Sequence, residues 1–169
     1  TRDNETADIS VRSAITGHLV VSTLHTNDSL STVIRLEDMG VEPYLVASSL
    51  VGVVAQRLVR KVCPYCGQLV APSANDAKLL TKKITAVPKA VGCNMCNNTG
   101  YLGRVAVHEI VTIDRHLKRM IAQNAQLDDL KAYAKSSQHY ETLFEATEKL
   151  VEEGVTTMEE LKRVSYYEE

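Results

Sequence analysis

The four cysteines of this sequence lie in two pairs, and each pair has two residues between its members. Cys63 and Cys66 enclose Pro-Tyr, and Cys93 and Cys96 enclose Asn-Met. Two intervening residues let both sulfurs reach one ion from a tight turn, and two such turns complete a tetrahedral site. Four thiolates leave no open position for a substrate, so the spacing predicts a structural zinc ion.

Other chemistries are open to the same cysteines. The run from Cys63 to Cys66 matches the glutaredoxin redox motif, although that motif belongs on a strand-to-helix turn near the start of a βαβ domain. A reactive Cys63 without bound metal would favour such a reductase. Disulfides are disfavoured if the chain is intracellular. Iron also accepts tetrathiolate geometry, so the spacing leaves zinc and iron as alternatives.

A second group of reactive side chains follows the apolar run 19–21 (Leu-Val-Val). This run comes after Gly17 and predicts a strand buried on both faces, as in a helix-covered parallel sheet. Ligands of open α/β sheets bind beyond the carboxyl ends of strands, so we expect a ligand near His25. The alternative is an ordinary turn in which Asn27 or Asp28 caps the next helix.

Helical spacing predicts the elements around this strand. We expect a helix from Asp3 or Thr6 to residue 16, and a second helix that ends at Gly40. Pro43 suits the first turn of a third helix, which we expect to run to residue 61. That segment is apolar nearly all round before Arg57, so the helix should be buried.

The rest of the chain changes character twice. Residues 62–104 are rich in Cys, Pro and Gly and predict a loop-rich insert, whereas 101–113 show partial alternation and predict one or two strands. Helical patterns follow from Asp114 onward. Asp114 can cap the first of these helices, Gly154 should end the third, and Thr157 has capping-box spacing to Glu160 before the last. The predicted segments are therefore 1–61, 62–104 and 105–169, the last ending in a helical bundle.

Composition narrows the functional class. The net charge is −2, from 19 basic and 21 acidic residues, so there is no overall attraction to nucleic acid. The charges are unevenly spread, with eight Lys/Arg and one acid in 57–104 but nine Glu and three Lys/Arg in 141–169. The longest uncharged run is shorter than the roughly 20 residues of a spanning helix, and we expect a soluble, intracellular chain.

Five runs resemble, in order, motifs of the ATPases that drive type II secretion and type IV pilus assembly. The resemblance covers essentially the whole chain. The runs are 2–6, similar to the end of the Walker B box; 16–28, similar to the His box; 56–60, similar to the lead into a tetracysteine element; 92–96 with 99–104 and Glu109, similar to its second half; and 154–160, similar to a terminal Gly-x-Thr-Thr-x-Glu-Glu motif.

The resemblance implies an α/β fold with part of a RecA-like P-loop NTPase core, a Cys₄ zinc insert and a C-terminal helical bundle. It implies a hexameric ATPase that uses ATP and Mg²⁺ and lies in the cytoplasm, on the inner face of the cytoplasmic membrane, with inner-membrane platform proteins as partners. His25 and Glu5 would be catalytic, His25 near the γ-phosphate. Arg2 and His18 would help to bind the nucleotide.

The sequence departs from that family in one decisive respect. It has no Gly-x-x-x-x-Gly-Lys-Ser/Thr run and therefore no P-loop. We expect a C-terminal portion of such an ATPase that begins within its domain and is inactive alone. The alternative is a non-enzymatic zinc-binding module that contacts other proteins. We expect a basic surface to meet a partner protein or anionic lipid, formed by Arg57, Arg60, Lys61, Lys78, Lys82, Lys83 and Lys89.

Overall fold

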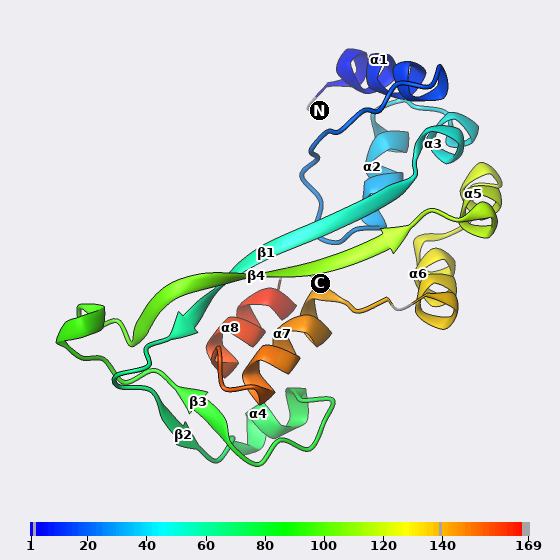
Figure 1. Cartoon of the computed structure of the whole chain (residues 1–169). Helices are drawn as coiled ribbons and strands as arrows, with labels where there is room; N and C mark the ends of the chain where they lie inside the picture. The colour runs from blue at the N-terminus through cyan, green and yellow to red at the C-terminus, as the bar shows by residue number, and fades with distance from the viewer. Residues whose placement is uncertain (2, 139, 167–169) are drawn as a thin grey trace. The chain divides into compact units, whose positions relative to one another are not determined.

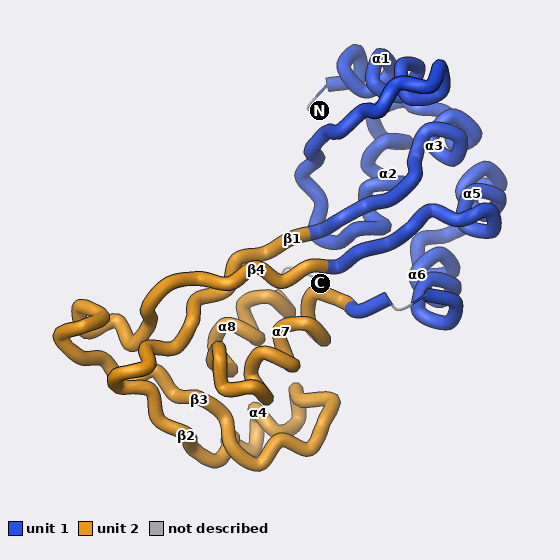
Figure 2. The backbone as a smooth tube through the Cα atoms, viewed as in Figure 1, with its two compact units in different colours: residues 1–55, 109–141 blue, residues 56–108, 142–169 orange. Residues whose placement is uncertain are grey.

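A computed structural model describes residues 1, 3–138 and 140–166 (Figure 1). The chain divides into two compact units (Figure 2). Unit 1 contains residues 1–55 and 109–141, and unit 2 contains residues 56–108 and 142–169. Each unit is therefore built from two separate stretches of the chain.

Unit 1 is built mainly from helices: α1 (Asn4–Ile15), α2 (Ser31–Asp38), α3 (Pro43–Ser49), α5 (Arg115–Ala122) and α6 (Leu127–Ser137). Helix α3 packs against α1, α2 and α5, and α5 packs against α6. Two predicted caps are confirmed: Asp3 accepts from Thr6 N–H, and Asp114 accepts from Leu117 N–H. The longest described helix, α1, has 12 residues, and no described helix could span a bilayer.

The core of unit 1 is aliphatic, as the scarcity of aromatic residues predicts. Each helix supplies small or branched side chains to one cluster, and strand β4 (Tyr101–Thr112) adds Val111, with Ile113 directly after it. The buried members include Ala7, Leu30, Val33, Val46, Val111, Leu117, Ile121 and Leu130.

The long helix predicted over residues 43–61 is wrong. Helix α3 ends at Ser49, and the chain continues as strand β1 (Gly52–Val62). Gly52 and the β-branched Val51, Val53 and Val54 stand at the change, and such residues favour a strand over a helix. The apolar run therefore serves two elements, and its second half satisfies its backbone by pairing with another strand.

Strand β1 pairs with β4 (Tyr101–Thr112) in a two-stranded sheet, so the strand predicted over 101–113 is confirmed. The strands run in opposite directions (Figure 1), and bonds at both ends fix the register. Ile113 N–H donates to Val51 O, and Cys63 N–H donates to Gly100 O, each at 2.9 Å. The pairing brings Gly100, four residues after the second cysteine pair, against Cys63, the first cysteine.

Unit 2 surrounds the cysteines with short elements. Strands β2 (Gln68–Val70) and β3 (Val87–Lys89) pair antiparallel with Leu69 opposite Pro88. The helices are α4 (Ala74–Leu79), α7 (Leu143–Glu152), α8 (Met158–Ser165) and the 3₁₀ turn η1 (Asn94–Cys96). Val87, Val151, Met158 and Leu161 form the small core.

The predicted C-terminal helices all form, and they are divided between the two units. Helices α5 and α6 belong to unit 1, whereas α7 and α8 belong to unit 2 (Figure 2). Gly154, with φ +79°, follows α7 where the sequence predicted a helix end.

The buried strand predicted over residues 19–21 does not form. These residues have no regular secondary structure, and Leu19 and Val21 are 93% and 87% exposed. A strand needs hydrogen-bonded neighbours, and no strand in the described part of the chain pairs with this segment. The run is apolar, as a buried strand would be, but no described strand pairs with it and its side chains are not covered.

Candidate functional site

The four cysteine sulfurs converge in unit 2, all within 4.8 Å of one another. The Sγ–Sγ distances are 3.9 Å for Cys63–Cys93 and 3.8 Å for both Cys66–Cys96 and Cys93–Cys96. A tetrahedral site with zinc–sulfur bonds of about 2.3 Å has sulfurs about 3.8 Å apart. The sulfurs are therefore spaced as the ligands of one such ion.

Backbone amides already support two of the sulfurs. Cys96 Sγ accepts from the N–H groups of Cys93 and Gly100 at 3.2 Å each, and Cys66 Sγ accepts from Gly92 N–H at 3.3 Å. N–H donors stabilise a thiolate more than a thiol, because the anion is the stronger acceptor. These contacts are the outer shell that a metal–thiolate site requires.

Two sulfurs differ in acidity for physical reasons that the contacts explain. Burial raises the pKa of the Cys66 thiol to about 11, and the donor from Gly92 offsets only part of that rise. Burial also acts to raise the pKa of Cys96, but the amides of Cys93 and Gly100 outweigh it and lower the value to about 6. Cys96 is thus prepared to act as a thiolate.

The turn after the second pair depends on unusual backbone conformations. Asn97 and Asn98 have positive φ values of 50° and 61°, and Gly100 has φ +77°. A Cβ at Gly100 would lie 2.6 Å from the Cβ of Ala90, so no side chain fits there without a shift. Glycine here lets the second cysteine pair turn back toward residue 90.

This geometry confirms that the cysteines form one cluster. The sulfurs are too far apart for disulfide bonds, which need about 2.05 Å. A redox-active pair at Cys63 and Cys66 would not require the second cysteine pair beside it, whereas a tetrahedral metal site would. Among the described residues, the cysteines are the only group of three or more potential metal ligands drawn together.

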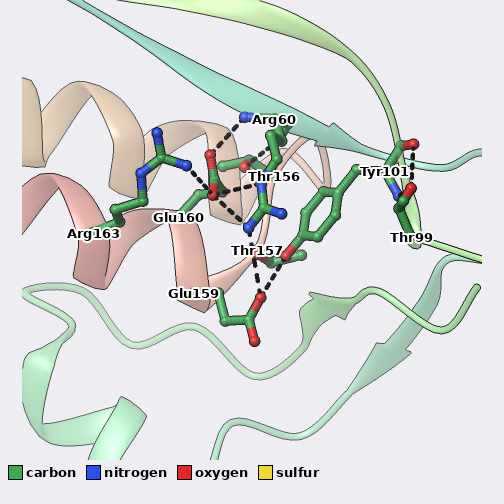
Figure 3. Close-up of polar contacts among 8 residues, drawn as sticks. All are labelled: Arg60, Thr99, Tyr101, Thr156, Thr157, Glu159, Glu160 and Arg163. Carbon is green, nitrogen blue, oxygen red and sulfur yellow. Dashed lines mark hydrogen bonds and ion pairs between the residues drawn. The ribbon is translucent and has the colours of Figure 1, made fainter.

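A polar network next to the cysteines centres on Arg60 in β1 (Figure 3). Its guanidinium lies over the Tyr101 ring, 3.9 Å from the centroid, and contacts Glu160 through Nε at 2.9 Å and Nη2 at 2.8 Å. The Tyr101 hydroxyl donates to Glu159 at 2.8 Å and lies 2.9 Å from the hydroxyl oxygen of Thr157. Burial is the main reason that the pKa of Tyr101 is raised.

The capping box predicted from Thr157 and Glu160 is wrong in its bonding. Thr157 is the N-cap residue of α8, but it makes no side-chain cap bond. Glu160 is 1% exposed and accepts instead from Arg60 and from Arg163 Nη1 at 3.3 Å. A buried carboxylate next to two guanidinium groups gains more from ion pairing than from one backbone amide.

Three of the predicted nucleotide residues, Glu5, His18 and His25, are exposed. His25 lies in the irregular segment before α2, and Glu5 lies in the first turn of α1. His18 Nδ1 is 3.3 Å from Ser13 O and 3.2 Å from Thr16 Oγ1. Arg2 lies outside the described residues. In the described part of unit 1, no hydrogen bond or ion pair joins Glu5, His18 and His25, so the three side chains are not brought together here.

The end of the segment from Thr16 to Asp28 is nevertheless firmly held. Glu109, 1% exposed, accepts from Ser29 N–H at 2.8 Å and from Ser29 Oγ at 2.5 Å. Asp28 accepts from Ser31 N–H at 2.7 Å and pairs with Lys131 Nζ at 2.7 Å. Burial acts to raise the pKa of Asp28, but these two partners outweigh it, and the pKa is lowered.

Sequence reasoning missed the structural roles of three buried carboxylates, although two had visible signals. Glu109 alternates with Val107 and Val111 on the buried face of β4. Glu148 lies in the buried stripe of α7 and accepts from Thr81 N–H at 2.5 Å. An acidic residue at a periodic core position indicates a hydrogen-bonded anchor. Glu160 gave no such signal, because its spacing from Thr157 favoured a cap.

Comparison with known proteins places residues 1–163 in a family described as Type II/IV secretion system protein. The type IV pilus assembly ATPase TfpB of Acinetobacter baylyi is 44% identical over 168 residues, covering 96% of this chain and 28% of that protein. The type II secretion system ATPase E of Vibrio cholerae is 40% identical over 167 residues, covering 97% and 33%. The chain thus spans about a third or less of these relatives.

Solved structures show the same fold. The pilus retraction motor PilT with bound ADP has a TM-score of 0.64 and 23% identity, over 97% of this chain and 37% of that one. The ATPase DotB of Legionella pneumophila has a TM-score of 0.63 and 17% identity, over 98% and 37%. The family match over nearly the whole sequence, together with relatives at 40% identity or more, shows that this chain belongs to the type II/IV secretion system protein family.

Proposed function

We propose that this chain is the C-terminal portion of a hexameric ATPase that drives type II secretion or type IV pilus assembly. The observation that carries the proposal is the family match over residues 1–163, with close relatives named for these activities. Those relatives are about three times as long, and this sequence contains no P-loop. The residues that cradle ATP phosphates would therefore come from other parts of the protein.

The cysteine cluster would hold one structural zinc ion. The sulfur spacing, the amide donors to Cys66 and Cys96 and the absence of an open ligand position support this assignment. Zinc would supply no chemistry beyond fixing the segment between β1 and β4, which contains few buried apolar residues of its own. One zinc per chain is the expected content, and iron in its place would show as visible absorption.

The nucleotide residues require the rest of the protein. We propose that residues 19–21 form a strand of a RecA-like sheet whose neighbouring strands lie elsewhere in the full-length protein. A cavity of about 420 Å³ beside this segment has an apolar lining that includes Val11, Val20 and Leu24. His25 and Glu5 would then act on the nucleotide, and Arg2 and His18 would help to bind it with Mg²⁺.

An ATPase assay tests the proposal that ATP hydrolysis needs both His25 and residues outside this chain. The 169-residue chain with Mg²⁺ and ATP should show no turnover, whereas the full-length protein should hydrolyse ATP and lose most activity on His25→Ala. A matched His116→Ala change lies on α5, outside the His-box segment, and should keep activity. Robust turnover by the short chain would contradict the proposal, as would a fully active His25→Ala enzyme.

We further propose a cytoplasmic location, on the inner face of the membrane, with platform proteins of the secretion or pilus machinery as partners. Arg60 pairs with Glu160 and Lys82 with Glu152, and the other basic side chains of residues 57–104 are suited to a partner protein or to anionic lipid. Vesicle sedimentation with and without anionic lipid tests the second option. If the amount of protein that sediments with vesicles does not depend on their anionic lipid content, a protein partner is the remaining option for this surface.

A further inference from the structure

The first turn of α8 contacts both chain segments that carry the cysteine pairs. Cys63 and Cys66 follow the end of β1, and Cys93 and Cys96 precede the start of β4. Arg60 lies three residues before the first pair, and Tyr101 lies five residues after Cys96. Both side chains reach α8 or the residues directly before it (Figure 3).

Three hydrogen bonds bind β1 to the segment that leads into α8. Arg60 N–H donates to Glu160 Oε2 at 2.7 Å, and Arg60 O accepts from Thr156 Oγ1 at 2.7 Å. Val62 N–H donates to Val155 O at 2.9 Å, directly before the first cysteine. The backbone that leads into Cys63 is thus held along residues 155–160.

The second segment is held through Tyr101. Its hydroxyl contacts Thr157 and Glu159, while its ring lies under the Arg60 guanidinium. The preceding residue, Gly100, donates to Cys96 Sγ and accepts from Cys63 N–H. Arg60 and Tyr101 therefore join the two cysteine-bearing segments to each other and to α8.

The buried Glu160 raises the free energy needed to separate α8 from β1. Its carboxylate is buried and depends on Arg60 and Arg163 for charge compensation. If α8 left its place, that compensation would be lost or replaced by water, and Arg60 would lose the contact that holds it over Tyr101. The position of α8 and the register of the cysteine segments consequently depend on the same side chains.

We infer that Arg60 is a positioning residue that couples metal binding at the four cysteines to the docking of α8. This rests on the metal centre proposed above. A bound ion orders the two cysteine segments, and ordered segments present Arg60 and Tyr101 to α8. Because coupling between two equilibria is reciprocal, docking of α8 must raise metal affinity by the same factor by which metal stabilises α8.

The test is zinc competition between the 169-residue chain and a chromophoric chelator. Arg60→Gln should weaken zinc binding by about tenfold, in the range of outer-shell losses around metal sites. Arg104→Gln is the matched control. It removes the same charge from β4, in a surface hollow that Arg104 lines with Arg60 and Tyr101, but Arg104 makes no hydrogen bond or ion pair with the described residues of α8, so affinity should change by less than about twofold. This pair separates a positioning effect from a general loss of positive charge.

A second readout follows α8 itself. Zinc should slow amide exchange in residues 157–165 of the wild-type chain, and Arg60→Gln should reduce that protection. Arg60→Lys keeps the charge but not the planar fork, so it should restore only part of the affinity. If Arg60→Gln fails to fold, Tyr101→Phe removes only the hydroxyl contacts and should weaken zinc binding by about threefold.

The outcomes distinguish this inference from the proposed metal centre. A wild-type chain that binds no zinc would overturn both. A wild-type chain that binds zinc, with Arg60→Gln or Tyr101→Phe binding it equally well, would overturn the coupling and leave the metal centre intact. Equal rates of amide exchange in α8 with and without zinc would also overturn the coupling.

Discussion

The cysteine cluster and the His-box segment are both defined by short motifs, yet only the first is complete in this chain. The four sulfurs lie within 4.8 Å, with amide donors around them. In contrast, Leu19 and Val21 are almost fully exposed, and His25 is exposed in an irregular segment. The cysteine site carries all its candidate ligands on its own chain segments, whereas we propose that residues 19–21 form a strand only beside neighbours from elsewhere in the full-length protein.

The largest expected effect is removal of the metal ion that we propose for unit 2. Structural zinc contributes about 10–16 kcal/mol of apparent binding free energy in zinc-finger peptides, so Cys96→Ser or strong chelation should unfold the segment between β1 and β4. Hydrogen exchange should show loss of protection in 62–104, with α5 and α6 little changed. Tyr65→Ala, at an exposed position inside the first cysteine pair, is the control and should keep one zinc per chain. Unchanged protection after chelation would contradict a structural ion.

Unit 1 should depend instead on a buried carboxylate. Glu109→Ala should lower the free energy of unfolding by about 3 kcal/mol, because both buried donors of Ser29 lose the acceptor that they share, Glu109 Oε1. Chemical denaturation monitored at unit 1 measures the loss. Zinc content should not change, which separates the two regions. A loss below about 1 kcal/mol would mean that the Ser29 donors find other partners.

A smaller and pH-dependent effect is expected at Asp28. Its pKa is lowered in the folded chain, so its contribution is complete above the unfolded pKa of about 3.9 and is lost as the pH falls through the lower folded value. Asp28→Asn should cost about 1–2 kcal/mol at pH 7. The difference from wild type should shrink below about pH 4, as measured by denaturant unfolding from pH 3 to pH 7. A constant difference would exclude the Lys131 pair as its source.

The smallest effect should come from the exposed apolar residues. Leu19→Ser with Val21→Ser should change the stability of this chain by less than about 0.5 kcal/mol, because neither side chain is buried. The same pair in the full-length protein should cost several times more if the segment is a sheet strand there. Equal and small effects in both proteins would remove the basis for a shared sheet.

Sequence patterns predicted what depends on local spacing. The cysteine pairs, the caps at Asp3 and Asp114 and the helix end at Gly154 all involve residues a few positions apart. The pattern failed where the outcome depended on distant partners. Residues 52–61 form a strand because β4 pairs with them. Glu160 makes no capping bond and instead binds Arg60, which lies 100 residues earlier in the sequence.

The alternation of the chain between its two units has a consequence for how the protein is made. Residues 1–55, 56–108, 109–141 and 142–169 belong in turn to unit 1, unit 2, unit 1 and unit 2. During synthesis, the first stretch of each unit therefore leaves the ribosome before either unit is complete. Unit 1 is complete only after residue 141, when the four cysteines of unit 2 have already been synthesised. The early cysteine segments should need protection from wrong metals or oxidation until α7 and α8 have been synthesised.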